Sequence, residues 1–163
     1  MRSFSNLWYW IALAVFWSTT SHWVLGVPYD MVLRARRHGG QAEIDLRDIV
    51  RINTNRILYI VRVSGFWLLA FSCFILTMLG VLGFYYWIEF AQALFLLALP
   101  MSIVGVLTLL TARKIVDEQP SGKALRKRLL RHRIVTQGIG MISIFVTALF
   151  GMYQNMSIAI LNG

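Results

Sequence analysis

Four long apolar runs alternate with short polar segments along this chain. Each run is long enough for a helix to cross the roughly 30 Å hydrocarbon core of a bilayer, and the runs are residues 7–27, 57–84, 88–111 and 134–153. The polar segments are residues 28–56 and 112–133, and only a short turn separates the second run from the third. The pattern predicts one all-α domain, residues 1–163, built as a bundle of four transmembrane helices.

Positive charge is concentrated in the two polar segments. The chain has 16 Lys and Arg against 7 Asp and Glu, a net charge of +9, and the segments hold all the basic residues but Arg2 when Arg62 extends its side chain to the interface. Because Lys and Arg beside a span resist translocation, we expect both segments in the cytoplasm and both termini in the periplasm of a bacterial inner membrane. The aromatic triplets at residues 8–10 and 85–87 would then share the outer interface.

Composition supports a chain surrounded mainly by lipid. Charged residues make up 14% of the chain and the mean hydropathy is +0.64, whereas a soluble domain is about a quarter charged. Orientation and attraction to anionic head groups account for the positive charge, so no nucleic-acid partner is predicted. Cys73 is the only cysteine, which excludes an intramolecular disulfide and a cysteine-pair metal site.

The first polar segment is predicted to be helical from about Ala42. Glu43 and Arg47 are oppositely charged and one turn apart, and neither glycine nor proline occurs between Glu43 and Gly65. We therefore expect a cytoplasmic helical extension that continues into the second span. Its acidic residues are expected to face the basic residues of the second polar segment; they are Glu43, Asp45 and Asp48.

Nine basic residues form the predicted surface for lipid or for a partner. They are Arg34, Arg36, Arg37, Lys123, Arg126, Lys127, Arg128, Arg131 and Arg133. Each basic residue near an anionic leaflet contributes about 1 kcal/mol. Two alternatives stay open: a solvated loop that only fixes topology, and a partner docked on Leu125 and Leu129, which are one helical turn apart.

Polar residues inside the runs are expected to join helices or to form an intramembrane site. Gln92 and two strips of small residues, Ser102–Gly105–Thr108 and Ser143–Thr147–Gly151, are expected at helix contacts. A possible intramembrane polar site comprises His22, Ser18 and Glu89, because an ionisable residue in a span is a functional hypothesis by default.

The plainer interpretation of His22 and Glu89 is contact with interfacial water, since each lies near the end of its predicted span. The other histidines, His38 and His132, are in the polar segments. A protein metal site generally takes three or four ligands. We therefore predict neither a metal, nor a cofactor, nor a catalytic residue.

Two stretches carry a resemblance to a known family: SNLWYWIALAVFWSTTSHWVLGVPYDMVLRARRHGGQAEIDLRDIVRIN and IEFAQALFLLALPMSIVG. They resemble small four-span inner-membrane proteins of photosynthetic and marine alphaproteobacteria. Some members are described as components of an iron–sulfur assembly complex. One cysteine in a span cannot hold a cluster, which normally takes four cysteine ligands, so the resemblance implies a membrane protein and no site residues.

Two function classes follow. The first is a non-enzymatic accessory or assembly protein that binds a larger inner-membrane complex through its spans and basic loops. The second is a small transporter or channel that uses Glu89 or His22 and works as an oligomer, since four spans alone line little cavity. The expected partners are anionic lipid head groups and a membrane protein or a second copy of the chain.

Overall fold

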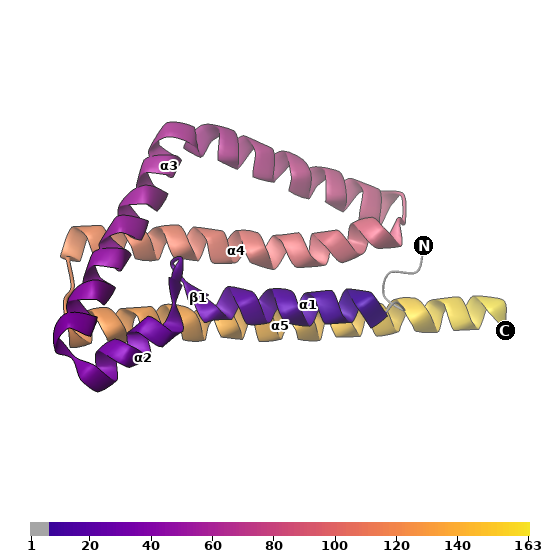
Figure 1. The fold of residues 1–163 in the computed structure, drawn as a ribbon. Coiled ribbons are helices and arrows are strands. Elements are labelled where there is room, and N and C mark those ends of the chain that lie inside the picture. Colours follow the sequence, from indigo (N-terminus) through magenta and orange to yellow (C-terminus); the bar gives the residue numbers. More distant parts are fainter. Residues whose placement is uncertain (1–6) are drawn as a thin grey trace.

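The computed structural model describes residues 7–163 and is almost entirely helical (Figure 1). Its helices are α1 Leu7–His22, α2 Tyr29–His38, α3 Gly40–Gly80, α4 Glu89–Glu118 and α5 Lys123–Asn162. A short antiparallel ladder, β1 Trp23–Val24 and β2 Val27–Pro28, joins α1 to α2, and a π-helical turn, η1 Val81–Tyr85, follows α3. The predictions for Arg2 and for the N-terminus fall on residues 1–6, outside the described part of the chain.

Three of these helices are long and apolar enough to cross a membrane. They are the segments Gly40–Tyr85, Glu89–Glu118 and Lys123–Asn162. The predicted class, a protein of helices that can span a bilayer, is confirmed at this level. α1 is shorter: its 16 residues give a length of about 24 Å at 1.5 Å per residue.

The first apolar run ends its helix earlier than the sequence predicted. The helix was expected to continue to Val27, but it stops at His22, and Val24 pairs with Val27 across a two-residue turn. Both turn residues, Leu25 and Gly26, have positive φ, at 53° and 75°. Positive φ at both positions matches the twist of a tight hairpin. Leu25 adopts this unfavourable conformation with its side chain buried in the core at 3% exposure.

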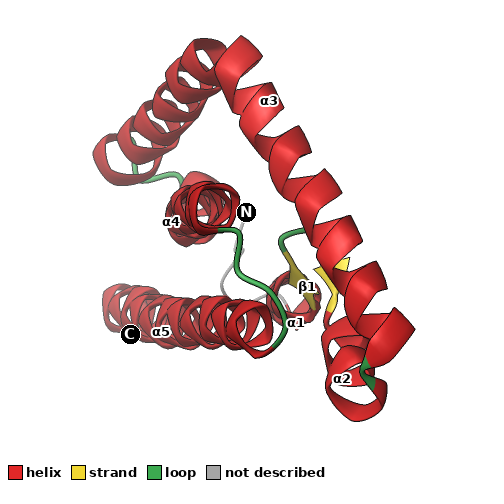
Figure 2. Cartoon of the chain, turned by 90° about the vertical axis from the view of Figure 1, so that its left-hand side faces the viewer, coloured by secondary structure: helices red, strands yellow, loops and turns green. Residues whose placement is uncertain are grey.

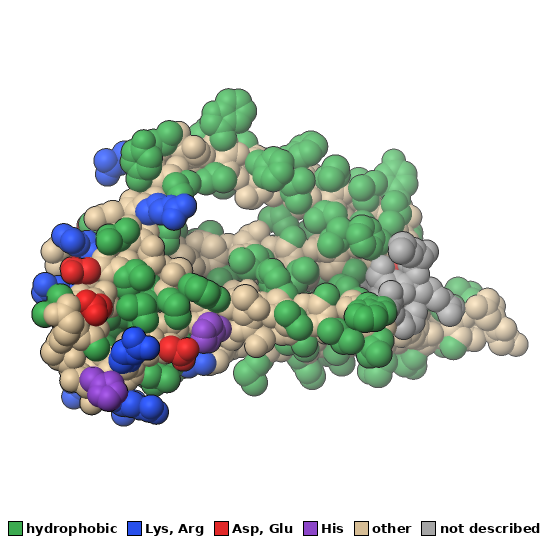
Figure 3. All heavy atoms as spheres, viewed as in Figure 1, with side chains coloured by type: hydrophobic (Ala, Val, Ile, Leu, Met, Phe, Trp, Pro, Cys, Tyr) green, Lys and Arg blue, Asp and Glu red, His purple; other side chains and the backbone are tan. Residues whose placement is uncertain are grey.

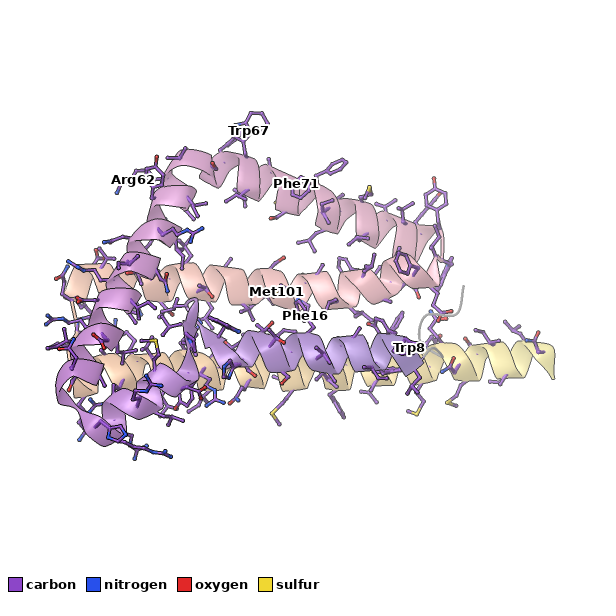
Figure 4. All side chains as sticks on the ribbon, viewed as in Figure 1. Trp8, Phe16, Arg62, Trp67, Phe71 and Met101 are labelled. Atoms are coloured by element: carbon purple, nitrogen blue, oxygen red, sulfur yellow. The ribbon has the colours of Figure 1, made fainter. Side chains whose placement is uncertain are left out.

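α3 is continuous, as the lack of glycine and proline before Gly65 predicted, but it is sharply bent. Its first limb, residues 40–64, crosses the end of the bundle, and its second limb, residues 65–80, runs back along it (Figures 1 and 2). The bend lies between Arg62 and Trp67 (Figure 4). The sequence there is Ser64–Gly65, a pair at which helices kink. The extension therefore lies across the bundle and does not prolong the axis of the second span.

Buried side chains form two clusters. The larger joins the hairpin, α2, the first limb of α3 and the adjoining ends of α4 and α5; its members are Val24, Leu25, Val27, Tyr29, Val32, Ala35, Leu46, Val50, Ala112, Ile115, Leu125 and Leu129. The smaller joins α1 to α4 and consists of Leu13, Trp17 and Val104. The end of the bundle that carries the polar segments is thus the better packed end.

α5 presents a face of small and polar side chains to its neighbours. Its buried positions recur every three or four residues, from Leu125 to Gly151. At Gly140 the ring of Trp17 lies so close that an added Cβ would be 2.8 Å from Trp17 Cε3. The predicted contact strip Ser143–Thr147–Gly151 is buried, which confirms it. The strip predicted on α4 is wrong, because Gly105 is exposed with nothing within 4 Å of its Cβ position.

The second limb of α3 stands apart from the other helices. It meets α4 at their shared turn and diverges from it toward the bend (Figures 1 and 2). Large apolar side chains are exposed on this limb, among them Phe66 at 79%, Trp67 at 76% and Phe71 at 65%. None of the most apolar 18-residue window of Gly40–Tyr85 is buried. The space-filling view leaves an opening between this limb and α4 (Figure 3).

Candidate functional site: a basic surface at one end of the bundle

Charged side chains gather at the end of the bundle where the first limb of α3, α2 and the α4–α5 loop meet (Figure 3). The rest of the visible surface is mainly apolar. Helix ends of this kind, with Lys and Arg at one side of an apolar span, are typical of the cytoplasmic side of membrane proteins. The two polar segments, far apart in the sequence, therefore form one surface.

The nine predicted binding residues divide into two groups. Six are exposed and able to meet a lipid surface or a partner: Arg34, Arg36, Arg37, Lys123, Lys127 and Arg131. The other three, Arg126, Arg128 and Arg133, are partly buried and make contacts within the chain. Sequence reasoning could not separate these groups, because all nine have the same charge and similar neighbours along the chain.

Two of the partly buried arginines pair with acids. Arg126 Nη1 lies 3.2 Å from Glu43 Oε1, and Arg128 Nη2 donates to Glu118 Oε2. The first pair confirms that acid on the first polar segment faces the second. It also explains Gly122, whose φ is 58° and whose Cβ position lies 2.7 Å from Glu43 Oε1, so that a larger residue there would meet the carboxylate.

The other two acids of the first segment do not reach the second. Asp45 Oδ1 accepts a 2.7 Å hydrogen bond from Gln41 Nε2, and Asp48 Oδ1 lies 3.8 Å from Arg51 Nη2 on the same helix. The expectation that all three acids face the basic segment therefore holds for Glu43 alone. Exposed pairs of this kind contribute about 0–1 kcal/mol each.

Arg133 joins three elements. Its Cζ lies 3.9 Å from the centroid of the Tyr29 ring, and its Nε donates a 3.3 Å hydrogen bond to the carbonyl of Ser21. The arginine of α5 is thus held by the end of α1 and the start of α2. A cation over an aromatic face contributes about 0.5–2 kcal/mol, more when water is excluded.

Leu125 and Leu129 do not form a docking face. Both are buried in the larger cluster, at 2% and 0% exposure. This burial contradicts the alternative in which a partner binds these two leucines. Their neighbour His132 is also buried, at 6%, and its Nδ1 lies 3.2 Å from Thr111 Oγ1 on α4.

The possible intramembrane site is not brought together. His22 and Ser18 are exposed at the end of α1 nearest the basic surface. Glu89 is in the first turn of α4, beside η1 at the opposite end of the bundle. His22 instead packs edge-on against Trp23, with ring centroids 6.1 Å apart. Among residues 7–163 the structure shows no group of three His, Cys, Asp or Glu side chains placed to hold a metal ion.

The structure adds a cavity that the sequence did not predict. It has a volume of about 430 Å³ and lies between the first limb of α3 and the loop from α4 to α5. Arg47 and Arg51 are on its rim, with Asn55 one turn farther along. The signal was present as arginines spaced by four on a helix, but only the fold shows that the α4–α5 loop lies beside them and that a cavity opens between the two.

Comparisons with protein-family models, with curated proteins and with solved structures find no match to this chain. The resemblance of residues 5–53 and 88–105 to alphaproteobacterial membrane proteins therefore stays a prediction.

Proposed function

We propose that this chain is a non-enzymatic accessory or assembly protein of a bacterial inner membrane, which docks on a larger membrane complex. The observation that carries the proposal is the second limb of α3. It is apolar, it diverges from its own bundle, and its most apolar window has no buried residue. A helix that packs so little on its own chain is available to pack on another.

The proposed orientation has four spans and places both termini in the periplasm. α1 lies beside α5 (Figure 1) and packs on it through Trp17 and Gly140. We therefore assign α1 as a span in addition to the three longer helices, although it is short. The hairpin that follows α1 brings the chain to the basic end. That end is then cytoplasmic by the positive-inside rule, and the six exposed basic residues face anionic head groups or an acidic patch of the partner.

A docking role is favoured over transport by the placement of the polar residues. The transporter or channel hypothesis needs Glu89 or His22 on a pathway through the bundle, but His22 is exposed at the last residue of α1 and Glu89 is in the first turn of α4, so each lies at an end of the bundle. The variants Glu89→Gln and His22→Ala test that hypothesis. A loss of a proton-linked flux in either variant would favour transport over docking.

Photocrosslinking from the second limb tests the docking proposal. Trp67 and Phe71 are each replaced by a photoreactive phenylalanine in the full chain, in the native membrane. Phe145 and Met141 of α5 are the matched controls, since they are exposed to a similar degree, at 64% and 71%. We expect a discrete protein adduct from the second limb and mainly lipid adducts from α5.

A result with only monomer and lipid adducts from Trp67 and Phe71 would contradict the proposal. Equal protein adducts from both helices would show that the second limb is not the specific surface. An adduct whose mass is twice that of the chain would identify a second copy as the partner.

A further inference from the structure

The cavity beside the first limb of α3 has an apolar floor and a polar rim. Val50, Ile115 and Leu125 lie at its base and are buried. Its rim carries hydrogen-bonding side chains from α3 and from the α4–α5 loop: Arg47, Asp48, Arg51, Asn55, Gln119 and Ser121. Its volume of about 430 Å³ is within the range of small-ligand sites, roughly 300–1,000 Å³.

Of the two rim arginines, Arg47 has no ion-pair partner among the described residues and Arg51 has only a long, exposed one. Arg47 makes no ion pair with another residue of 7–163, and the carboxylate of nearby Glu43 is held by Arg126 at 3.2 Å. Arg51 has one acidic neighbour, Asp48, at 3.8 Å. Because positions four apart lie on one helix face, Arg47 and Arg51 point to the same side as Asn55. The guanidinium groups of Arg47 and Arg51 and the amide of Asn55 are thus available at the mouth of the cavity.

The opposite wall is built by the turn that ends α4. Gln119 adopts a left-handed conformation with φ of 46°, and its N–H donates to the Ile115 carbonyl at 2.9 Å. This turn carries Gln119 and Ser121 to the rim. The carboxyl end of α4 has the partial negative charge of a helix C-terminus, and with Asp48 it supplies acceptors beside the two arginines.

We propose that this cavity binds a small phosphate ester whose other end carries a hydroxyl or a primary amine. Arg47 and Arg51 donate to the phosphate, since guanidinium groups recognise phosphate oxygens in a bidentate manner. Asp48 and the end of α4 accept from the hydroxyl or the amine. The head groups of phosphatidylglycerol and phosphatidylethanolamine share this chemistry with soluble esters such as glycerol 3-phosphate. The site goes beyond the docking role and does not depend on it.

The test uses the full chain, purified and freed of lipid in a neutral detergent. The probes are short-chain phosphatidylglycerol, glycerol 3-phosphate and short-chain phosphatidylcholine, whose quaternary ammonium has no hydrogen to donate. Binding is read by native mass spectrometry and by the rise in unfolding temperature. Arg47→Gln/Arg51→Gln should weaken binding of a phosphate probe by about tenfold or more, because hydrogen bonds to charged groups are lost.

The matched control is Arg113→Gln/Lys114→Gln, which removes the same charge from exposed positions outside the cavity rim. It should change binding by less than about twofold. Asn55→Trp, which keeps both arginines and fills the mouth, should weaken binding as the arginine variant does. Phosphatidylcholine should bind more weakly than phosphatidylglycerol.

The outcomes separate the source of the ligand from the existence of the site. Phosphatidylglycerol binding that glycerol 3-phosphate does not displace identifies a lipid head group, and displacement identifies a soluble ester. Equal losses in the arginine variant and its control would overturn the proposal, because the effect would be general charge. Absence of binding by both phosphate probes would overturn it as well.

Discussion

The guanidinium of Arg133 lies over the ring of Tyr29, with 3.9 Å between Cζ and the ring centroid. This contact fixes the entry of α5 against the start of α2, and the bond from Arg133 Nε to the Ser21 carbonyl adds the end of α1. The basic end is thereby one packed unit, and not a pair of loose loops.

The Tyr29 ring face should matter more than its hydroxyl. Tyr29→Phe keeps a face for the cation and should change the free energy of unfolding by less than about 0.5 kcal/mol, whereas Tyr29→Leu should lower it by about 1–2 kcal/mol. Arg133→Lys should also destabilise, since Lys lacks the planar group that stacks. Denaturant unfolding in detergent measures these differences. A Tyr29→Leu variant as stable as Tyr29→Phe would contradict the contact.

The exposed basic residues should bind anionic membranes without supporting the fold. Lys127→Gln/Arg131→Gln should weaken association with phosphatidylglycerol vesicles by about 1 kcal/mol per residue at low salt and by less at high salt. Unfolding should be unchanged. Co-sedimentation of the nanodisc-held protein with phosphatidylglycerol vesicles, at two salt concentrations, checks the salt dependence. Binding equal to wild type at low salt would leave this surface a topology signal only.

Charge reversal of Arg126, Lys127 and Arg128 together should have a mixed effect. All three belong to the basic surface predicted from the sequence, so their reversal should weaken binding to lipid or to a partner. Arg126 and Arg128, however, pair with Glu43 and Glu118, and reversal would place like charges together. We therefore expect a lower unfolding temperature for the triple variant than for Lys127→Glu alone, and equal temperatures would contradict the two pairs.

The close approach of α1 to α5 depends on the lack of a side chain at Gly140. An added Cβ would be 2.8 Å from the ring of Trp17, so Gly140→Ala should destabilise by about 1–3 kcal/mol through overpacking. Gly138 on the same helix has nothing within 4 Å of its Cβ position. Gly138→Ala is therefore the matched control and should be neutral or slightly stabilising. Unfolding of the two variants in detergent should separate them, and equal stability would contradict the packing.

Gln92 should be a strong polar link at the end of the bundle opposite the basic surface. It is 1% exposed, its Nε2 donates to the Gly83 carbonyl at 2.7 Å, and its Oε1 accepts from Gln154 Nε2 at 3.0 Å. Gln92→Leu would remove the hydrogen bonds to the Gly83 carbonyl and to Gln154 Nε2, and should lower the free energy of unfolding by about 1–3 kcal/mol. Gln137→Leu is the control, because Gln137 makes no hydrogen bond to another described side chain. Equal losses would show that Gln92 is only a packing residue.

Periodicity and charge predicted the helical class and the contact between Glu43 and the basic segment. These features depend on local patterns and on which helix ends meet. The hairpin at Leu25–Gly26 could not be predicted, because its unfavourable leucine conformation is maintained by burial against α2 and α3. The bend of α3 at Ser64–Gly65 was not predicted, because its direction depends on how the first limb packs.

In the site, too, residue types could be predicted from the sequence and their packing could not. Basic residues were recognised from their type, yet only packing separates Arg133, which is held by Tyr29, from exposed Arg131. Leu125 and Leu129 have helical spacing whether they face a partner or the core, and burial at 2% and 0% decides the matter. The cavity at Arg47 required the α4–α5 loop to lie beside α3, a relation between residues about 70 positions apart.

The cytoplasmic orientation of the basic end decides which membrane leaflet the proposed lipid-binding surface and the cavity would face. Reporter fusions at His38, Gly122 and Gly163, with paired cytoplasmic and periplasmic reporters, test it most directly. We expect a cytoplasmic signal at His38 and Gly122 and a periplasmic signal at Gly163. A cytoplasmic signal at Gly163, or a periplasmic one at Gly122, would contradict four spans with the basic end inside.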